Sequence, residues 1–346
     1  MRNRRNSPRG IARTLLWLFG LALALLFVAT TINVLLLIFA GLLVGILLRA
    51  CSMAVSCRTG LGPGLSLALV LIGLAALLAG AAFFLAPNVA VQLRLLADQL
   101  PKAWQELQDR LGWLAGDDAF QTLEARIAGS VRGAGGDVAS QLVGAAWGTV
   151  GVIGAAILIF FIGVYLAADP GSYRRGIVAL VPPPRRGRAS EILDALGSTL
   201  LWWLIGKSIS MTVVGVLTWI GLWLLDVPLP LTLSLIAALL TFVPNLGPVL
   251  AAAPAVLLAI PAGLGLAAWV LAMYVAVQTI ESYLVTPLVQ QRTVALPPAL
   301  VISMQLIMGA LAGAGGLALA TPLTAAGLVL TRELYVRDVL DRRRSI

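Results

Sequence analysis

The sequence has no histidine among its 346 residues, only two cysteines, and few charged residues, which make up 11% of the chain. Without histidine, the chain lacks the commonest general base and no serine has a histidine partner for nucleophilic catalysis. Two cysteines alone cannot make a four-ligand zinc site. We therefore predict no catalytic residues, no metal site and no cofactor, and an intramembrane enzyme is the function class that the sequence supports least.

The low charge content also argues against an ordinary soluble domain, in which about 25% of residues are charged. Hydrophobic residues make up 60% of the chain, and the mean hydropathy is +0.98. Several apolar runs reach the roughly 20 residues that a transmembrane helix needs. The sequence therefore predicts an all-α integral membrane protein with about eight transmembrane helices, for which the lipid bilayer is the first partner.

The net charge of +9 does not indicate a nucleic-acid partner, because the basic residues gather where apolar runs end. This pattern is typical of the positive-inside rule. It predicts that both termini are cytoplasmic, since arginines precede the first run and follow the last: Arg2, Arg4, Arg5, Arg9, Arg13, Arg332, Arg337, Arg342, Arg343 and Arg344.

The first half of the chain divides into three segments. Residues 1–86 hold transmembrane helices 1–3, the first two within Thr14–Leu48 and joined by a turn at Thr30–Asn33. Residues 87–141 carry five basic and seven acidic residues and predict an extracytoplasmic segment, with a helix whose apolar face runs from Leu93 to Leu114. Residues 142–204 hold a fourth transmembrane helix, which ends at Asp169, then a basic cytoplasmic loop and an amphipathic helix.

The second half is a core at residues 205–331, followed by a basic cytoplasmic tail at 332–346. The core begins with a fifth span, near whose start we expect Lys207 to extend its amine to the headgroups. Two apolar stretches of the core are interrupted, one at Pro244–Pro248 and the other by the glycine-rich Gly309–Gly316, and Leu264–Val285 between them reads as an unbroken span. Each interrupted stretch predicts a helical hairpin, re-entrant or fully spanning.

Irregular backbone at membrane depth is tolerated only where it is buried in protein or lines a wet cavity. Paired interrupted helices point to a transporter site near the middle of the membrane. The alternative is a simple turn at the membrane surface, which Pro-Asn and Gly-Pro also favour. On the first interpretation the two breaks frame the substrate or ion pathway through Pro244, Asn245, Gly247, Pro248, Gly309, Gly313 and Gly316.

Between the breaks, Gln278, Glu281 and Ser282 fall on one helical face among apolar neighbours. A carboxylate within a span is costly and usually faces the protein interior or an aqueous cavity, where it can carry a proton. The alternative is that Glu281 lies near the cytoplasmic end of the span and pairs with Arg292. We predict that these three residues, together with Pro287, belong to the pathway.

At these residues the sequence resembles the autoinducer-2 exporter (AI-2E) family of bacterial membrane transporters. The resemblance rests on "FVPNLGPVLAAAPAVLLA", on "QTIESYLVTPLV" and on the C-terminal "GALAGAGGLALATPLTAAGLVL", which occur in the family's order. It implies a secondary transporter in the bacterial inner membrane that exports a small polar metabolite such as autoinducer-2, coupled to protons.

Two other functions remain open from the sequence. A sodium/proton antiporter would use sodium ions as the partner, with oxygen ligands from Glu281, Gln278 and Asn245. A membrane scaffold would bind its partners through the external helix. That helix and the glycine-rich faces also predict a homo-oligomer.

Overall fold

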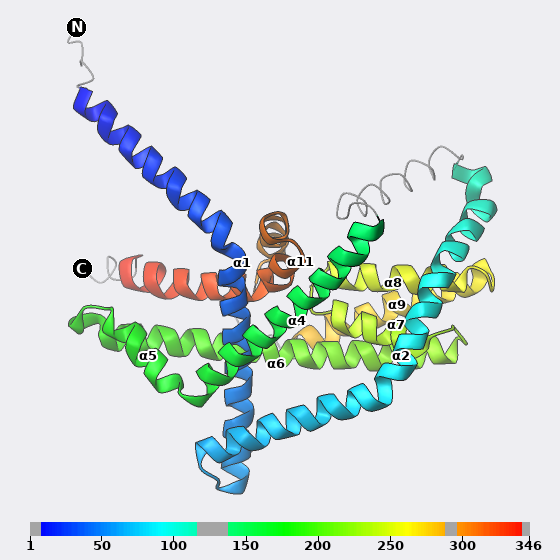
Figure 1. Cartoon of the computed structure of the whole chain (residues 1–346), viewed down its shortest axis with the longest axis horizontal. Coiled ribbons are helices and arrows are strands. Elements are labelled where there is room, and N and C mark those ends of the chain that lie inside the picture. The colour runs from blue at the N-terminus through cyan, green and yellow to red at the C-terminus, as the bar shows by residue number, and fades with distance from the viewer. Residues whose placement is uncertain (1–7, 116–137, 288–295, 341–346) are drawn as a thin grey trace.

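The computed structural model describes residues 8–115, 138–287 and 296–340, and over these residues the chain is entirely helical (Figure 1). In chain order the elements are α1 (Pro8–Thr59), α2 (Pro63–Ala115), α4 (Val138–Ala168), α5 (Pro170–Ala179), the 3₁₀ turn η1 (Pro183–Arg185), α6 (Arg186–Leu224), α7 (Pro230–Leu240), α8 (Leu246–Ala259), α9 (Leu264–Ile280), the π-helix η2 (Glu281–Val285), α11 (Pro298–Leu330) and the π-helix η3 (Thr331–Leu340).

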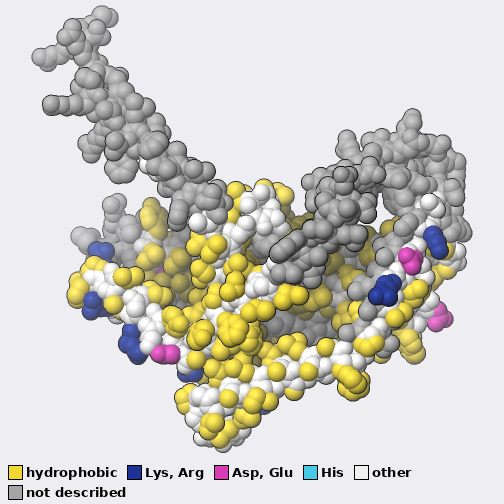
Figure 2. All heavy atoms as spheres, viewed as in Figure 1, with side chains coloured by type: hydrophobic (Ala, Val, Ile, Leu, Met, Phe, Trp, Pro, Cys, Tyr) yellow, Lys and Arg dark blue, Asp and Glu magenta, His cyan; other side chains and the backbone are white. Residues whose placement is uncertain are grey.

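Five of the described helices are long and apolar enough to cross a bilayer, or six if α4 and α5, bent by 85°, count as one broken span. The shorter apolar helices α7 and α8 bring the apolar segments to eight. In Figure 2 charged side chains gather over α5 on one flank and over the outer part of α2 on the other, and the face between them is largely hydrophobic. The predicted all-α membrane fold is confirmed.

The N-terminal helices are longer than the sequence indicated. α1 continues without interruption through Thr30–Asn33, so the turn expected there is wrong. Those four residues include no proline or glycine to break a helix, and Ile32 packs against Met308 and Ala320 of α11. α2 likewise passes through Pro87, so the segment predicted to be extracytoplasmic begins as a continuation of the third predicted span. Residues 116–137 of that segment lie outside the described part of the chain.

The middle of the chain follows the prediction more closely. α4 ends at Ala168, and the carboxylate of Asp169 accepts a hydrogen bond of 3.0 Å from the backbone amide of Ser172. This side-chain cap starts α5 in a new direction, which accounts for the bend between the two helices. The amphipathic helix and the fifth span that we predicted form one helix, α6, of 39 residues.

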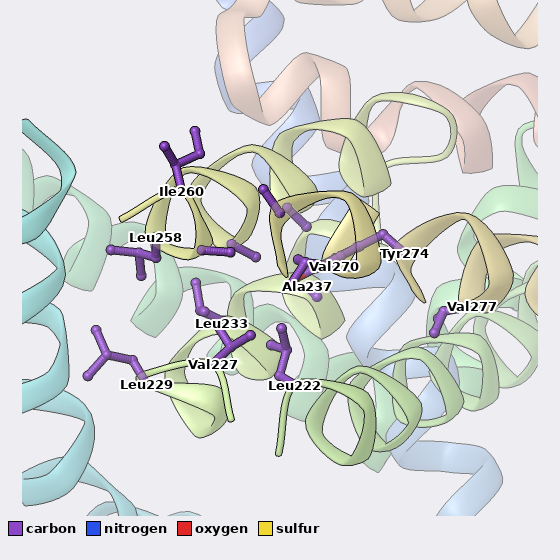
Figure 3. Packing of buried hydrophobic residues seen from close by; sticks show 14 of the residues in the cluster. Leu222, Val227, Leu229, Leu233, Ala237, Leu258, Ile260, Val270, Tyr274 and Val277 are labelled. Carbon is purple, nitrogen blue, oxygen red and sulfur yellow. The ribbon is translucent and has the colours of Figure 1, made fainter. Parts of the chain in front are cut away.

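The largest buried cluster joins α6, α7, α8 and α9 (Figure 3). At its centre Leu222, Leu233 and Val270 are completely buried, one from each of α6, α7 and α9. In a bilayer such side chains gain close van der Waals contact with the neighbouring helices, because lipid tails are as apolar as leucine and burial removes no surface from water. The cluster therefore holds the first interrupted stretch as a unit against the long helix α6.

α7 and α8 form the first predicted hairpin. They have 11 and 14 residues, which at 1.5 Å per residue gives lengths of about 16 and 21 Å. Neither reaches the roughly 30 Å of a bilayer's hydrocarbon core. Length therefore favours a hairpin that enters and leaves on one side.

The second interrupted stretch, within α11, consists of two helical segments that meet at a sharp kink. Inside α11, Ala312 and Gly313 leave the helical region, and Gly313 has a φ of +60°. Such a φ is open to glycine at little cost, so the predicted glycine-rich break is present within Gly309–Gly316.

An ion-pair cluster joins the basic loop to the C-terminal segment. Arg188, at the start of α6, contacts the Glu333 carboxylate at 2.9 Å, and Arg337 contacts the same group at 2.9 Å. The Glu333 side chain is only 10% exposed, so this pairing is shielded more than a surface salt bridge is. Two segments that the charge pattern assigned to one side of the membrane therefore meet.

Candidate functional site: a polar cavity at the first helix break

A cavity of about 310 Å³ lies between α6, the α7–α8 connection, the end of α9 and the start of α11. Apolar helices surround it, yet side chains with hydroxyl, amide, amine and carboxylate groups line it. Polar groups in such a place are stable only when they bond to one another, to water or to a ligand. The cavity is therefore a candidate for the binding of a polar solute.

The carboxylate of Glu281 is the centre of the hydrogen bonds in the cavity. Its Oε1 accepts from the Ser210 hydroxyl of α6 and from Thr286 at 3.2 Å. Its Oε2 accepts from the Gln278 amide at 3.3 Å and faces the Ser282 hydroxyl at 3.5 Å. Two donors on each oxygen occupy the roughly four acceptor positions of an ionised carboxylate. Glu281 is 9% exposed, so the protein itself supplies the solvation that water would give.

A π-helical turn places Glu281 where these donors can reach it. α9 ends at Ile280, and Glu281–Val285 continues it with wider turns. π-turns inside helices are rare and are frequent at functional sites. Here the turn brings Thr286 within reach of Glu281, five residues earlier. The predicted span over Leu264–Val285 is thus continuous, with a local change in winding that the sequence did not indicate.

A residue of α11 forms a hydrogen bond to the first helix break, between α7 and α8. The Gln305 amide, which is 2% exposed, donates a hydrogen bond of 2.9 Å to the carbonyl of Pro244. That carbonyl lies at the break, beyond the end of α7. Asn245 follows with a φ of +66° and a ψ of −48°, and the backbone amide of Leu246 donates to the Pro244 carbonyl at 2.8 Å. This is the geometry of a γ-turn with positive φ, which is rare and strained, and α8 begins at Leu246.

Six of the eleven predicted pathway residues line this one cavity: Pro244, Asn245, Pro248, Gln278, Glu281 and Ser282. Gly247 lies just behind the lining, where an added Cβ would fall 1.9 Å from the carbonyl oxygen of Leu240. Pro287 follows Thr286, which does line the cavity. Gly309, Gly313 and Gly316 belong to the kink of α11 and are not part of the lining.

Sequence reasoning missed eleven residues of the lining, and six of these have a polar group in the side chain: Trp203, Lys207, Ser210, Thr241, Thr286 and Thr321. The expectation that Lys207 extends its amine to the headgroups is wrong, because its side chain lines the cavity near Glu281. Lys207 and Ser210 lie three residues apart on one face of α6, which was the available signal. The remaining contacts join residues distant in sequence, such as Ser210 and Glu281, which are 71 positions apart.

The sequence of this chain matches a known transporter family over nearly its whole length. Residues 14–335 match the family model described as "AI-2E family transporter", which covers α1 to the first half of η3 and every residue named in the cavity. The chain belongs to the AI-2E family.

Two relatives in Bacillus subtilis (strain 168) support membership of the AI-2E family. "Putative transport protein YrrI" is 28% identical over 170 residues, 49% of this chain and 48% of the relative. "Putative transport protein YueF" is 25% identical over 293 residues, 81% of this chain and 79% of the relative. The aligned part therefore spans about half of the first relative. Together with the apolar helices, family membership shows a multi-pass membrane protein that belongs to a transporter family.

Proposed function

We propose that this AI-2E family member is a secondary transporter of the bacterial inner membrane, with both termini in the cytoplasm, and that the cavity around Glu281 lies on its substrate pathway. The cargo is a small polar metabolite that moves outward, with autoinducer-2 as the candidate that the family name supplies. The observation that carries the proposal is a buried carboxylate in a polar cavity at a helix break. A helix that faces only lipid would have neither the carboxylate nor the cavity.

The hydrogen bonds of Glu281 support proton coupling. Three of its four donors are hydroxyls, from Ser210, Thr286 and Ser282, and a hydroxyl can also accept a hydrogen bond. A proton on Glu281 is therefore accommodated by rotation of one hydroxyl, without loss of a bond. Because Ser210 belongs to α6 and Glu281 to η2, such a change alters a contact between two helices, which is what a coupled transporter requires.

The test uses purified protein in liposomes with an imposed proton gradient, in which autoinducer-2 movement and internal pH are recorded together. We expect gradient-dependent flux in the wild type and at least a tenfold loss, about 1.4 kcal/mol, in Glu281→Gln. Glutamine preserves size and keeps one acceptor oxygen, and its amide NH2 can donate to a hydroxyl such as that of Ser210 or Thr286, but it cannot exchange a proton. Glu191→Gln is the matched control, because Glu191 is an exposed residue of α6 that pairs with Arg188.

Other outcomes would contradict the proposal in different ways. If the flux of Glu281→Gln equalled that of the wild type, Glu281 would have no role in proton coupling. A pH change that requires added sodium, without movement of autoinducer-2, would favour the sodium/proton antiporter. If neither signal appears and only deletion of the outer part of α2 abolishes the cellular function, the scaffold hypothesis would replace transport.

A further inference from the structure

We propose that the pathway runs on from the cavity between α6 and α9, and that the hydroxyls of Thr218 and Tyr274 contact the polar cargo there. This assignment rests on the proposed function, because it takes the cavity around Glu281 as the first part of the pathway. Neither residue lines the cavity, and both lie in a part of the molecule that is closed in this structure.

Thr218 and Tyr274 continue the two helix faces that carry the charged residues of the cavity. Thr218 follows Lys207 by eleven residues, which is three turns of α6 and a rotation of about 20°. Tyr274 precedes Glu281 by seven residues, which is two turns of α9 and again a rotation of about 20°. At 1.5 Å per residue they lie about 16 Å beyond Lys207 and about 10 Å beyond Glu281, toward the end of α6 and the start of α9.

The two residues lie within the interface of α6 and α9. On the cavity side, the Ser210 hydroxyl of α6 bonds to Glu281, which directly follows α9. On the far side, Gly221 of α6 is so close to α9 that an added Cβ would fall 2.6 Å from Cγ of Met273. Both residues fall between these two contacts, one on each helix. The antiparallel helices therefore enclose the two hydroxyls.

Both hydroxyls are buried and have no hydrogen-bond partner within the described residues. Thr218 is completely buried, and Tyr274 is 7% exposed. Tyr274 belongs to the buried cluster of α6–α9, whose other buried members are aliphatic (Figure 3). A buried hydroxyl without a partner is destabilising, and valine or phenylalanine would fill the same space without that cost. The closed arrangement therefore gives no reason for a hydroxyl at either position.

An open arrangement of α6 and α9 gives such a reason. A secondary transporter exposes its site to one side of the membrane at a time, so the cluster that closes this end has to part in another state. The hydroxyls of Thr218 and Tyr274 then line the opening and can donate to, or accept from, water and a polar cargo. A purely aliphatic wall would leave the polar groups of the cargo without partners.

Thiol labelling tests whether this interface opens, and it needs no knowledge of the cargo. Thr218→Cys is made together with Cys51→Ser and Cys57→Ser, because both native cysteines are exposed. Thr324→Cys is the matched control, since Thr324 is also buried, at 4% exposure, but belongs to α11. In liposomes with a charged methanethiosulfonate reagent on both sides, we expect Thr218→Cys to react at least tenfold faster than Thr324→Cys. Equal rates would overturn the proposal.

Thr218→Val and Tyr274→Phe then remove each hydroxyl and keep the shape of the side chain. Because no hydrogen bond is lost, the thermal unfolding midpoint in detergent should stay or rise, whereas flux should fall at least threefold. Thr324→Val removes a buried hydroxyl that bonds to the Ala320 carbonyl at 2.7 Å, so its midpoint should fall. Thr212→Val, on an exposed face of α6, should keep the flux of the wild type.

Two results of these substitutions would contradict the assignment. A lower midpoint in Thr218→Val would show that its hydroxyl has a partner in the closed arrangement. Wild-type flux in both Thr218→Val and Tyr274→Phe would show that the cargo does not pass between α6 and α9. If autoinducer-2 does not move even in the wild type, the labelling rates still decide whether the interface opens. Equal labelling rates with intact flux would reject this assignment alone and leave the role of Glu281 standing.

Discussion

The two helix breaks of this AI-2E family member look alike in sequence but differ in what they face. At the first, between α7 and α8, Pro244, Asn245 and Pro248 line the cavity. At the second break, inside α11, Ala312 and Gly313 leave the helical region, but neither residue lines the cavity. Both use a glycine for close packing: an added Cβ at Gly247 would meet the Leu240 carbonyl oxygen at 1.9 Å, and one at Gly316 the Met308 carbonyl oxygen at 2.1 Å.

A proline- or glycine-rich break therefore predicts tight backbone packing, whereas cavity lining depends on the neighbouring helices. The first break faces the side of α6 that carries Lys207 and Ser210. The second acts indirectly, because Gln305 on the N-terminal half of α11 bonds to the Pro244 carbonyl. We interpret the first break as the site and the second as part of its support.

The largest expected effect comes from filling the two close contacts with Gly247→Ala and Gly316→Ala. In each variant a methyl group would collide with backbone that no side-chain rotation can clear. The cost should exceed the roughly 1–3 kcal/mol of an ordinary overpacking substitution. We expect both to lower the thermal unfolding midpoint in detergent and to abolish flux.

The controls for this prediction are Gly265→Ala in α9 and Gly315→Ala in α11, where an added Cβ has no atom within 4 Å. Alanine in an open helical position stabilises by roughly 0.5–1 kcal/mol relative to glycine, so their midpoints should stay or rise. If Gly316→Ala and Gly315→Ala behaved alike, the tight turn of α11 would not be as described.

Several features of the site could be predicted from the sequence because they are local. Proline removes a backbone donor and glycine allows close approach, so the positions of both breaks follow from residue identity. Gln278, Glu281 and Ser282 share a face because helical spacing requires it. Lys207 was misplaced because a lysine near the end of a span can either reach the headgroups or turn inward, and only the packing of α6 against η2 decides between them. Gln305 and Thr321 carried no local signal at all.

The prediction of two spans within α1 failed for a different reason. It relied on the length and composition of the apolar run and gave too little weight to local helix propensity. A largely apolar stretch of 35 residues, Thr14–Leu48, suggested two spans, and the polar Thr30–Asn33 within it suggested the turn. Threonine and asparagine are only weakly unfavourable in a helix, and α1 continues through them. Length alone did not require a turn, because a helix can extend beyond the bilayer.

An intermediate effect is expected from Gln305→Leu, which removes the hydrogen bond between α11 and the first break without adding atoms at a close contact. The Pro244 carbonyl would lose the donor at 2.9 Å that α11 supplies and keep the backbone amide of Leu246 at 2.8 Å. Loss of one hydrogen bond costs roughly 0.5–1.5 kcal/mol, so the unfolding midpoint should fall slightly and flux should decrease. Leu306→Met, one position along and exposed, is the matched control. An unchanged midpoint and flux would show that the second break does not support the first.

The smallest expected effect comes from Gln92→Leu, at the far end of the first hairpin. The Gln92 amide oxygen of α2 accepts from the backbone amide of Thr232 at 3.2 Å and from its hydroxyl at 2.7 Å. It thus caps the start of α7, whose own N-cap residue, Leu229, has no side-chain acceptor. Loss of a helix cap costs roughly 0.5–2 kcal/mol, and Val91→Leu, exposed on α2, is the control.

Hydrogen exchange should rise in the first turn of α7 and stay unchanged at Pro244–Pro248, because the buried cluster of α6–α9 holds the break independently of α2. Faster exchange at the break as well would mean that α2 and the cavity move as one unit.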